Sequence, residues 1–257
     1  MGNALNTLVF QPPKATYAHN DPHLHMVPTK NGHTIAAYFI RNRLDTQTHT
    51  QTLCRKAKLT ILFSHGNAED IGTVVHALMT RIGKWEANIF IYDYSGYGLS
   101  GGRPSEHNVY MDVEAAYDYL TDVIGVDERT IVPFGRSIGS GPAIHIALHR
   151  KVVGLILQCP VASIYRVKLQ RVAFTLPGDI FCNIDKVTKL RVPTLIIHGT
   201  NDEVVPIKCS KQMALKIPEV YCRWIKGASH NDMDEKYAVY VERALQEFFY
   251  KVIPTYT

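Results

Sequence analysis

The chain has 257 residues, a length that one α/β domain reaches, and its 46% of hydrophobic residues can form a large buried core. Together with 20% of charged residues, this composition excludes disordered, collagen-like and coiled-coil proteins. The formal net charge is +5, but lysine and arginine do not gather in one basic run, so we predict no nucleic-acid partner.

The sequence shows neither a membrane-spanning segment nor a secretion signal. No stretch approaches the roughly 20 consecutive apolar residues of a membrane span. The first seven residues carry neither a basic leader nor an apolar run, which argues against secretion. The five cysteines are odd in number and form no Cys-x-x-Cys pair, which is typical of reduced thiols in a cytoplasmic protein.

From residue 60 onward, short apolar runs alternate with amphipathic stretches. We predict strands at 59–63, 88–92, 130–134, 152–158, 194–198 and, more weakly, 221–225. The runs are apolar nearly throughout, as expected for strands covered on both faces. Helices are predicted over 109–124, 142–149 and 237–248, the first ending at Gly125. This order predicts an α/β fold with a mostly parallel sheet and helices on both faces.

Two segments interrupt this alternation. Residues 41–58 are polar and rich in Thr and Gln, which predicts a surface loop. Residues 161–190 are longer than one crossover helix needs and contain Pro177-Gly178, so we predict a short lid over the ends of the strands. The predicted organisation is therefore an N-terminal leader over 1–20 and a single domain over 21–257, with the lid around 161–190.

The segment with the clearest chemistry is Gly135-Arg136-Ser137-Ile138-Gly139, which follows a predicted strand and precedes a predicted helix. A serine on such a sharp turn projects its hydroxyl from the carboxyl edge of the sheet, where the helix N-terminus favours negative charge. The alternative is a Gly/Ser-rich turn that only connects two elements. We predict that Ser137 is a catalytic nucleophile.

A serine hydroxyl needs a base, and the base needs an orienting acid. In folds with this turn, the chain order is serine, acid, histidine. Asp202 follows the predicted strand at 194–198, and His230 follows the strand at 221–225, so both belong to the same sheet edge as Ser137. We predict Asp202 as the acid, because it comes earliest after its strand, and His230 as the base.

The oxyanion of such a reaction needs backbone N–H donors. The first predicted donor is Ile138, which follows the nucleophile. The second is predicted in the loop after the strand at 59–63, with Asn67 favoured and Ala68 as the alternative; an ordinary glycine turn is the competing interpretation. His65 and His198 each precede a glycine, and we expect them to brace their turns rather than act as bases.

We predict no cofactor and no metal site. The Gly-rich loop at 94–104 lacks the spacing and the lysine of a phosphate-binding loop. The pair His23-x-His25 is isolated from other ligand-type residues, and exposed strand residues are the favoured interpretation.

Five stretches together resemble the alpha/beta-hydrolase-domain seventeen proteins and their fungal and plant relatives: residues 63–72, 92–106, 134–142, 181–205 and 227–232. The resemblance implies an α/β-hydrolase fold with Ser137, Asp202 and His230 as nucleophile, acid and base. It also implies a membrane-associated serine hydrolase that removes palmitate from protein cysteines. Those relatives carry a palmitoylated N-terminal cysteine cluster, whereas here no cysteine precedes Cys54.

The N-terminus offers another anchor, because Met1-Gly2 resembles an N-myristoylation signal. The competing interpretation is a plain flexible start. One myristoyl chain binds membranes only marginally, so a second contact is needed. The lid offers one, since its apolar residues alternate with Arg166, Lys168 and Arg171; packing of this apolar side onto the domain is the alternative. We expect a cytoplasmic protein at the cytosolic face of membranes.

The leading hypothesis is a serine hydrolase that cleaves long-chain acyl thioesters, palmitoyl-cysteine in proteins above all, through an acyl-enzyme intermediate. One alternative keeps the same residues but acts on monoacylglycerol, lysophospholipid or acyl-CoA. Another is a protein that only binds acyl ligands on the same fold. The substrate partner is therefore an acylated protein or a lipid, and the sequence predicts no oligomeric state.

Overall fold

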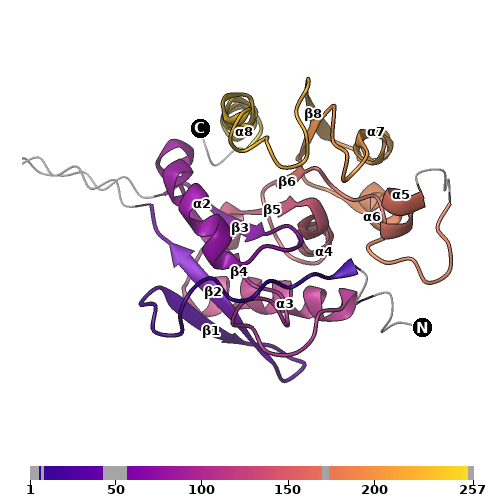
Figure 1. Ribbon diagram of the computed structural model, residues 1–257. Helices are drawn as coiled ribbons and strands as arrows, with labels where there is room; N and C mark the ends of the chain where they lie inside the picture. Colours follow the sequence, from indigo (N-terminus) through magenta and orange to yellow (C-terminus); the bar gives the residue numbers. More distant parts are fainter. Residues whose placement is uncertain (1–5, 7–8, 43–56, 170–173, 254–257) are drawn as a thin grey trace, which may run out of the picture.

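The computed structural model describes residues 6, 9–42, 57–169 and 174–253 (Figure 1). Three predicted features lie outside the described residues: the lipidation at Gly2, the polar loop at 41–58 apart from its two ends, and lid residues 170–173. No helix of the described part is long and apolar enough to cross a bilayer.

Eight strands form one sheet in the order β1-β2-β4-β3-β5-β6-β7-β8. Their bounds are β1 Leu24–Pro28, β2 Thr34–Ile40, β3 Leu59–Ser64, β4 Ala87–Tyr92, β5 Ile131–Arg136, β6 Leu155–Gln158, β7 Thr194–Gly199 and β8 Val220–Ile225. β1 and β2 are antiparallel to their neighbours, and the other pairs are parallel. The six predicted strands correspond to β3–β8, and the predicted α/β sheet is confirmed.

The sequence did not predict β1 and β2. β1 lies at the edge of the sheet and has a single buried residue, so it lacks the continuous apolar run of a central strand. β2 pairs with β4 between Ala37–Tyr92 and Ile40–Ile89, and its middle residues are buried. The hairpin thus extends the parallel sheet by two antiparallel strands, on the side away from β8.

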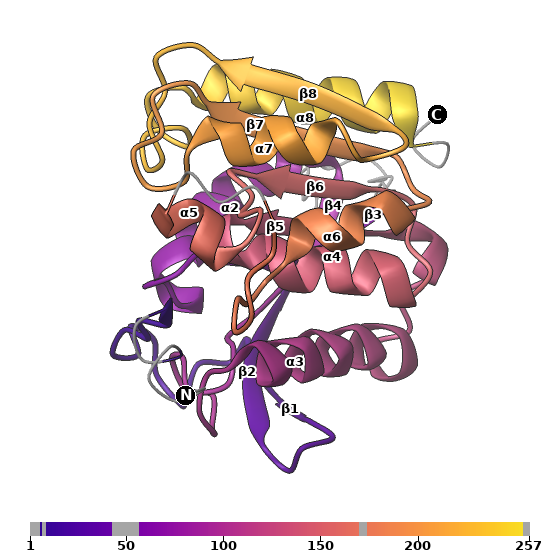
Figure 2. The ribbon, with the colours of Figure 1, turned by 90° about the vertical axis from the view of Figure 1, so that its right-hand side faces the viewer.

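Helices cover both faces of the sheet (Figure 2). α3 (Glu106–Asp118), α4 (Ser140–His149), α6 (Asn183–Lys186) and α7 (Ile207–Ala214) lie on one face, and α2 (Ile71–Trp85) and α8 (Ala238–Val252) lie on the other. Each face has its own apolar cluster. The first contains Ile144 of α4 and Met213 of α7, and the second contains Leu78 of α2 and Leu245 of α8.

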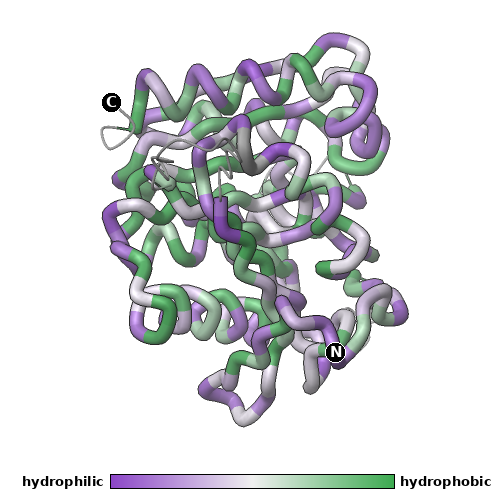
Figure 3. The backbone as a smooth tube through the Cα atoms, turned by 90° about the vertical axis from the view of Figure 1, so that its left-hand side faces the viewer, coloured by the Kyte–Doolittle hydropathy of each residue, from purple (hydrophilic) through white to green (hydrophobic). Residues whose placement is uncertain are grey.

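Hydropathy follows this layering. Every residue of β3 is buried, and the strands of the sheet interior are hydrophobic in Figure 3, whereas α8 alternates between hydrophilic and hydrophobic residues along its turns. This is the pattern of a helix with one face in the core and the other in water. The predicted helix at 237–248 is therefore confirmed, and it extends four residues beyond its predicted C-terminal end.

Local signals set the helix ends. Asp70 caps α2 by accepting from the Thr73 N–H, while the Thr73 hydroxyl accepts from the Asp70 N–H. Ser105 caps α3 in the same way through the Asn108 N–H. The predicted helix over 109–124 is confirmed, but its last turn is a π-helical segment at Tyr119–Val123. Gly125 follows with φ of +77°, the left-handed conformation that ends a helix.

Part of the predicted leader lies against the domain. Val9 and Phe10 are buried, and the backbone N–H and hydroxyl of Thr16 both donate to the Asp70 carboxylate, at 2.7 and 2.6 Å. Tyr17 donates a hydrogen bond to Asp93. Residues 9–17 are thereby fixed to the loops at the carboxyl ends of β3 and β4, and the first of these loops also borders the site described next.

Candidate active site

Ser137 occupies a strained turn directly after β5. Its φ is +54°, a left-handed conformation that non-glycine residues rarely adopt. The neighbouring glycines are required by space: a Cβ on Gly135 would lie 2.3 Å from the Gly139 carbonyl oxygen, and one on Gly139 would lie 2.1 Å from that of Ser64. The turn therefore packs against the end of β3 and presents the Ser137 hydroxyl to the cavity beside it.

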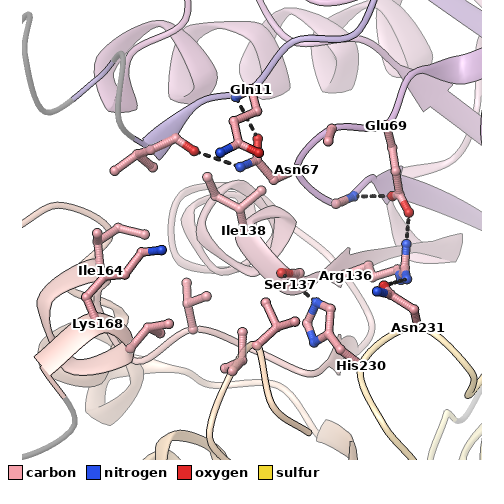
Figure 4. Close-up of a pocket in the computed structure, with 17 residues that line it drawn as sticks. Gln11, Asn67, Glu69, Arg136, Ser137, Ile138, Ile164, Lys168, His230 and Asn231 are labelled. Carbon is pink, nitrogen blue, oxygen red and sulfur yellow. Dashed lines mark hydrogen bonds and ion pairs between the residues drawn. The ribbon is translucent and has the colours of Figure 1, made fainter.

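Ser137, His230 and Asp202 form a hydrogen-bonded chain. His230 Nε2 lies 3.1 Å from Ser137 Oγ (Figure 4). His230 Nδ1 lies 2.7 Å from Asp202 Oδ2. Ser137 and His230 are 8% and 7% exposed, so the chain is shielded from water but opens into the cavity. The three residues come from the ends of β5, β7 and β8, and the structure brings all three together.

Asp202 is held as a carboxylate. Burial opposes its ionisation, but hydrogen bonds from His198 and His230 and from the Val205 N–H outweigh burial and keep its pKa well below the usual value. The N–H groups of Val204 and Val205 donate to Oδ1, at 2.9 and 2.7 Å. A negative Asp202 can keep the hydrogen on Nδ1 of His230, which leaves Nε2 free to accept the serine proton.

His198 and Cys159 also contact Asp202, and the ligand atoms of these three buried residues lie within 4.8 Å of one another. Their polar atoms already have hydrogen-bond partners. His198 Nδ1 lies 2.5 Å from Ser210 Oγ and its Nε2 lies 2.9 Å from the Val205 carbonyl oxygen. Burial and the neighbouring Asp202 raise the pKa of the Cys159 thiol, which opposes the thiolate that a metal needs. The cluster therefore fits a bracing role for Asp202 better than a metal site.

The loop after β3 supplies the opposite wall of the cavity. Gly66, Asn67 and Ala68 line it together with Ile138, and Ala68 has φ of +56°. Both predicted oxyanion donors, Asn67 and Ile138, thus border the space in front of Ser137 (Figure 4). The alternative donor Ala68 borders it as well.

The two histidines predicted to brace their turns are fully buried and do so. His65 Nδ1 lies 2.8 Å from the Gly66 carbonyl oxygen, and its Nε2 lies 3.3 Å from Asp93. His198 contacts the turn after β7 through Val205 and Asp202. Neither histidine lines the cavity.

Arg136, which precedes the nucleophile, is a site residue that the sequence did not predict. It forms an ion pair with Glu69, and its Nη2 donates to Asn231 Oδ1 at 3.3 Å (Figure 4). Glu69 in turn accepts from the Gly66 N–H at 2.6 Å. Arg136 therefore joins the nucleophile turn, the loop after β3 and the loop that carries His230. In the sequence, only its position inside the Gly-x-Ser-x-Gly turn indicates that Arg136 belongs to the site.

The cavity has a volume of about 290 Å³. Aliphatic residues and polar or charged residues contribute about equally to its lining, and the lid helix α5 (Ile164–Leu169) supplies Ile164, Val167 and Lys168. One lid expectation is wrong: Arg166 is buried rather than presented to a surface, because its guanidinium bonds the hydroxyls of Ser163 and Thr175. Phe181 is also buried, against Gly141 of α4, whereas Leu169 and Phe174 are exposed.

Comparison with solved structures identifies the fold. An esterase from Pyrococcus furiosus superposes with a TM-score of 0.73 at 14% identity, covering 95% of this chain and 98% of the esterase. Alpha/beta hydrolase domain-containing protein 10 from mouse superposes with a TM-score of 0.67 at 20% identity, covering 89% of this chain and 98% of that protein. At these identities, the similarity establishes the α/β-hydrolase fold that the sequence predicted.

Sequence comparison gives the family. Residues 55–186 match the family model described as serine aminopeptidase, S33. Alpha/beta hydrolase domain-containing protein 17B from Xenopus laevis is 38% identical over 222 residues, which cover 86% of this chain and 73% of that protein. Protein 17C from Xenopus tropicalis is 43% identical over 202 residues, covering 77% of this chain and 64% of that protein. The chain therefore belongs to the alpha/beta-hydrolase-domain seventeen family, as its sequence stretches predicted.

Proposed function

We propose that the protein is a serine hydrolase that forms an acyl-enzyme on Ser137. The observation that carries this proposal is the hydrogen-bonded chain from Ser137 through His230 to Asp202, set at the wall of a cavity that aliphatic and polar residues line together. The left-handed backbone of Ser137 supports it, because strain of this kind is kept only where the surrounding structure enforces it.

In the proposed reaction, Ser137 Oγ attacks the acyl carbonyl while His230 Nε2 takes its proton. The N–H groups of Ile138 and Asn67 stabilise the oxyanion. His230 then gives the proton to the departing thiolate or alkoxide, and the acyl group remains on Ser137. Water attacks this ester with His230 again as base, which releases the fatty acid and restores the serine.

The proposed substrate is a long-chain acyl thioester, with palmitoyl-cysteine in proteins as the leading case. The aliphatic part of the lining, which includes Ile138, Val161 and Ile164, suits an alkyl chain. Membership of the alpha/beta-hydrolase-domain seventeen family supports the choice of a thioester. Monoacylglycerol, lysophospholipid and acyl-CoA are the alternatives, and a panel of these with a palmitoylated peptide decides among them by kcat/KM.

We propose a membrane surface as the place of action. Leu169 and Phe174 are 54% and 67% exposed on the lid, next to the exposed Lys168. Replacing both apolar residues by serine is expected to reduce flotation with anionic vesicles, and unchanged flotation would contradict this contact. Myristoylation of Gly2 is a separate proposal, which the mass of the N-terminal peptide from cells tests directly.

The catalytic proposal is tested with a fluorophosphonate probe. Ser137→Ala is expected to abolish labelling and acyl-ester hydrolysis while keeping the melting temperature of the wild type. Ser105→Ala, a serine that caps α3 and does not line the cavity, is the matched control and should keep its labelling. Undiminished labelling of Ser137→Ala would overturn the assignment, and a wild-type protein inert to the probe would favour the binding-only alternative.

A further inference from the structure

Two residues near the start of the chain form part of the cavity wall. Val9 and Gln11 line the cavity, and Val9 and Phe10 are 6% and 4% exposed. We call residues 9–11 the N-terminal strap. In sheets of this kind, the loops between strands and helices usually form the site. The strap is not one of these loops, yet it contributes to the cavity wall. The strap therefore contributes to the site in a way that the nucleophile turn does not predict.

Hydrogen bonds fix the strap to the loop after β3. The Asn67 side chain donates from Nδ2 to the Val9 carbonyl oxygen at 2.7 Å, and its Oδ1 accepts from the Gln11 N–H at 3.0 Å. The Tyr97 hydroxyl donates to the same Oδ1 at 2.6 Å. Asn67 and Gln11 accordingly lie next to each other in Figure 4. Both ends of the Asn67 amide are used, so the strap and this loop hold one another in place.

Phe10 fixes the strap on its other side. Its ring packs edge-on against the ring of Phe181, with 5.9 Å between the centroids. Phe181 is fully buried and fills the space over Gly141, where a Cβ would lie 2.3 Å from its ring. The strap is thus held between the loop after β3 and the base of the lid. A side chain at position 9 has little freedom to move away from a ligand in the cavity.

We propose that Val9 is a specificity-determining residue, whose side chain limits the length of the acyl chain that the cavity accepts. This inference rests on the proposed serine-hydrolase function. Ligand cavities usually have volumes of about 300–1,000 Å³. This cavity, at about 290 Å³, is slightly smaller, so the size of one side chain in its wall strongly affects the space left for a ligand. Each methylene that gains or loses burial is expected to change the rate about fourfold.

Val9 can be changed without breaking the strap, because its bond to Asn67 uses the backbone carbonyl. Val9→Ala enlarges the cavity, and Val9→Phe fills it. Val239→Ala and Val239→Phe on α8 are matched controls, since Val239 is 78% exposed and does not line the cavity. If Val9→Phe does not fold, as thermal melting would reveal, Val9→Leu replaces it.

The measurement is the rate constant for inactivation by alkyl fluorophosphonates of graded chain length. In this reaction Ser137 Oγ forms a bond to phosphorus, fluoride leaves, and His230 takes the proton, so no turnover is needed. We expect Val9→Ala to raise the ratio of long-chain to short-chain rate constants at least fourfold for each additional methylene group that the enlarged cavity accepts. Val9→Phe should lower that ratio, and both Val239 variants should keep the wild-type ratio.

Folded Val9 variants that keep the wild-type ratio would overturn the inference and leave the serine-hydrolase proposal intact. A wild-type protein that reacts with no member of the series would overturn that proposal, and this inference with it. The two failures are therefore distinguishable in one experiment.

Discussion

His198 and Asp202 are joined by a contact of 3.1 Å between Nε2 and Oδ2, the same oxygen that accepts from Nδ1 of His230. One carboxylate oxygen of Asp202 thus serves two histidines, and the other accepts two backbone N–H groups. Because His198 Nε2 faces Asp202 and the Val205 carbonyl oxygen, it carries the hydrogen, and Nδ1 accepts from the Ser210 hydroxyl. His198 is therefore a positioning residue for the acid.

Loss of this brace is expected to lower the turnover rate. His198→Ala removes one charged hydrogen bond, and we expect kcat to fall about tenfold with little change in KM. Steady-state hydrolysis of an acyl ester measures both constants. His198→Gln, which retains a donor, should recover part of kcat, and His149→Ala on the exposed end of α4 should behave as wild type. Wild-type kcat in a folded His198→Ala protein would contradict this role.

The ion pair between Arg136 and Glu69 should contribute to both stability and activity. Glu69→Gln leaves an acceptor for the Gly66 N–H but removes the charge opposite Arg136, whose side chain is only 14% exposed. We expect a loss of about 1–3 kcal/mol in the free energy of unfolding, measured by urea denaturation. Glu247→Gln, which breaks surface pairs with Arg223 and Arg243, should cost less, because solvent screens exposed ion pairs. Equal costs for the two variants would refute the distinction.

The nucleophile turn should reject a methyl group at its second glycine. In Gly139→Ala, the new Cβ would lie 2.1 Å from the Ser64 carbonyl oxygen, so either the turn or the end of β3 must shift. We expect loss of fluorophosphonate labelling together with a lower melting temperature. Gly101→Ala is the control, because its Cβ would meet no atom closer than 3.6 Å. Normal labelling of Gly139→Ala would show that the turn is less confined than its packing indicates.

Asp112 should make stability depend on pH. Burial raises its pKa to about 7, against hydrogen bonds from the N–H and hydroxyl of Ser95, which lower it. At pH values between the ordinary pKa of 3.8 and about 7, Asp112 is protonated in the folded state and ionised in the unfolded state. The free energy of unfolding should therefore fall as pH rises through this window, by at most about 1.4 kcal/mol per pH unit.

The test is urea denaturation of wild type and Asp112→Asn at several pH values between 4 and 8. The variant cannot titrate at this position, so its stability should fall less steeply with pH than that of the wild type. Asp122→Asn, at an exposed residue, serves as the control and should keep the wild-type slope. Identical slopes in wild type and Asp112→Asn would exclude the effect.

The parts of this protein that sequence alone predicts are those that depend on local patterns. The strands β3–β8 are visible because residues buried on both faces form continuous apolar runs, and the turn at Ser137 needs glycines at fixed spacing. Asp202 and His230 follow from their order after β7 and β8. These features need no knowledge of which distant residues meet.

The parts that it does not predict depend on contacts between distant residues. The bond between Val9 and Asn67 joins positions 58 residues apart, and nothing near Val9 indicates its partner. The pair of Arg136 with Glu69 is similar, because an arginine after a strand is consistent with solvent exposure as well. The burial of Arg166 is a third case, because an arginine in a polar segment is usually exposed. Its guanidinium instead bonds the hydroxyls of Ser163 and Thr175.

The N-terminal strap has a consequence for how the site is assembled during synthesis. Val9 leaves the ribosome well before Phe181, against which the strap packs, and before His230. The contact between the strap and Phe181 can therefore form only after most of the sheet has been synthesised, and contacts this far apart in sequence form slowly. A nascent chain that has not yet reached His230 holds Ser137 without its base, so the site becomes complete only after His230 has been added.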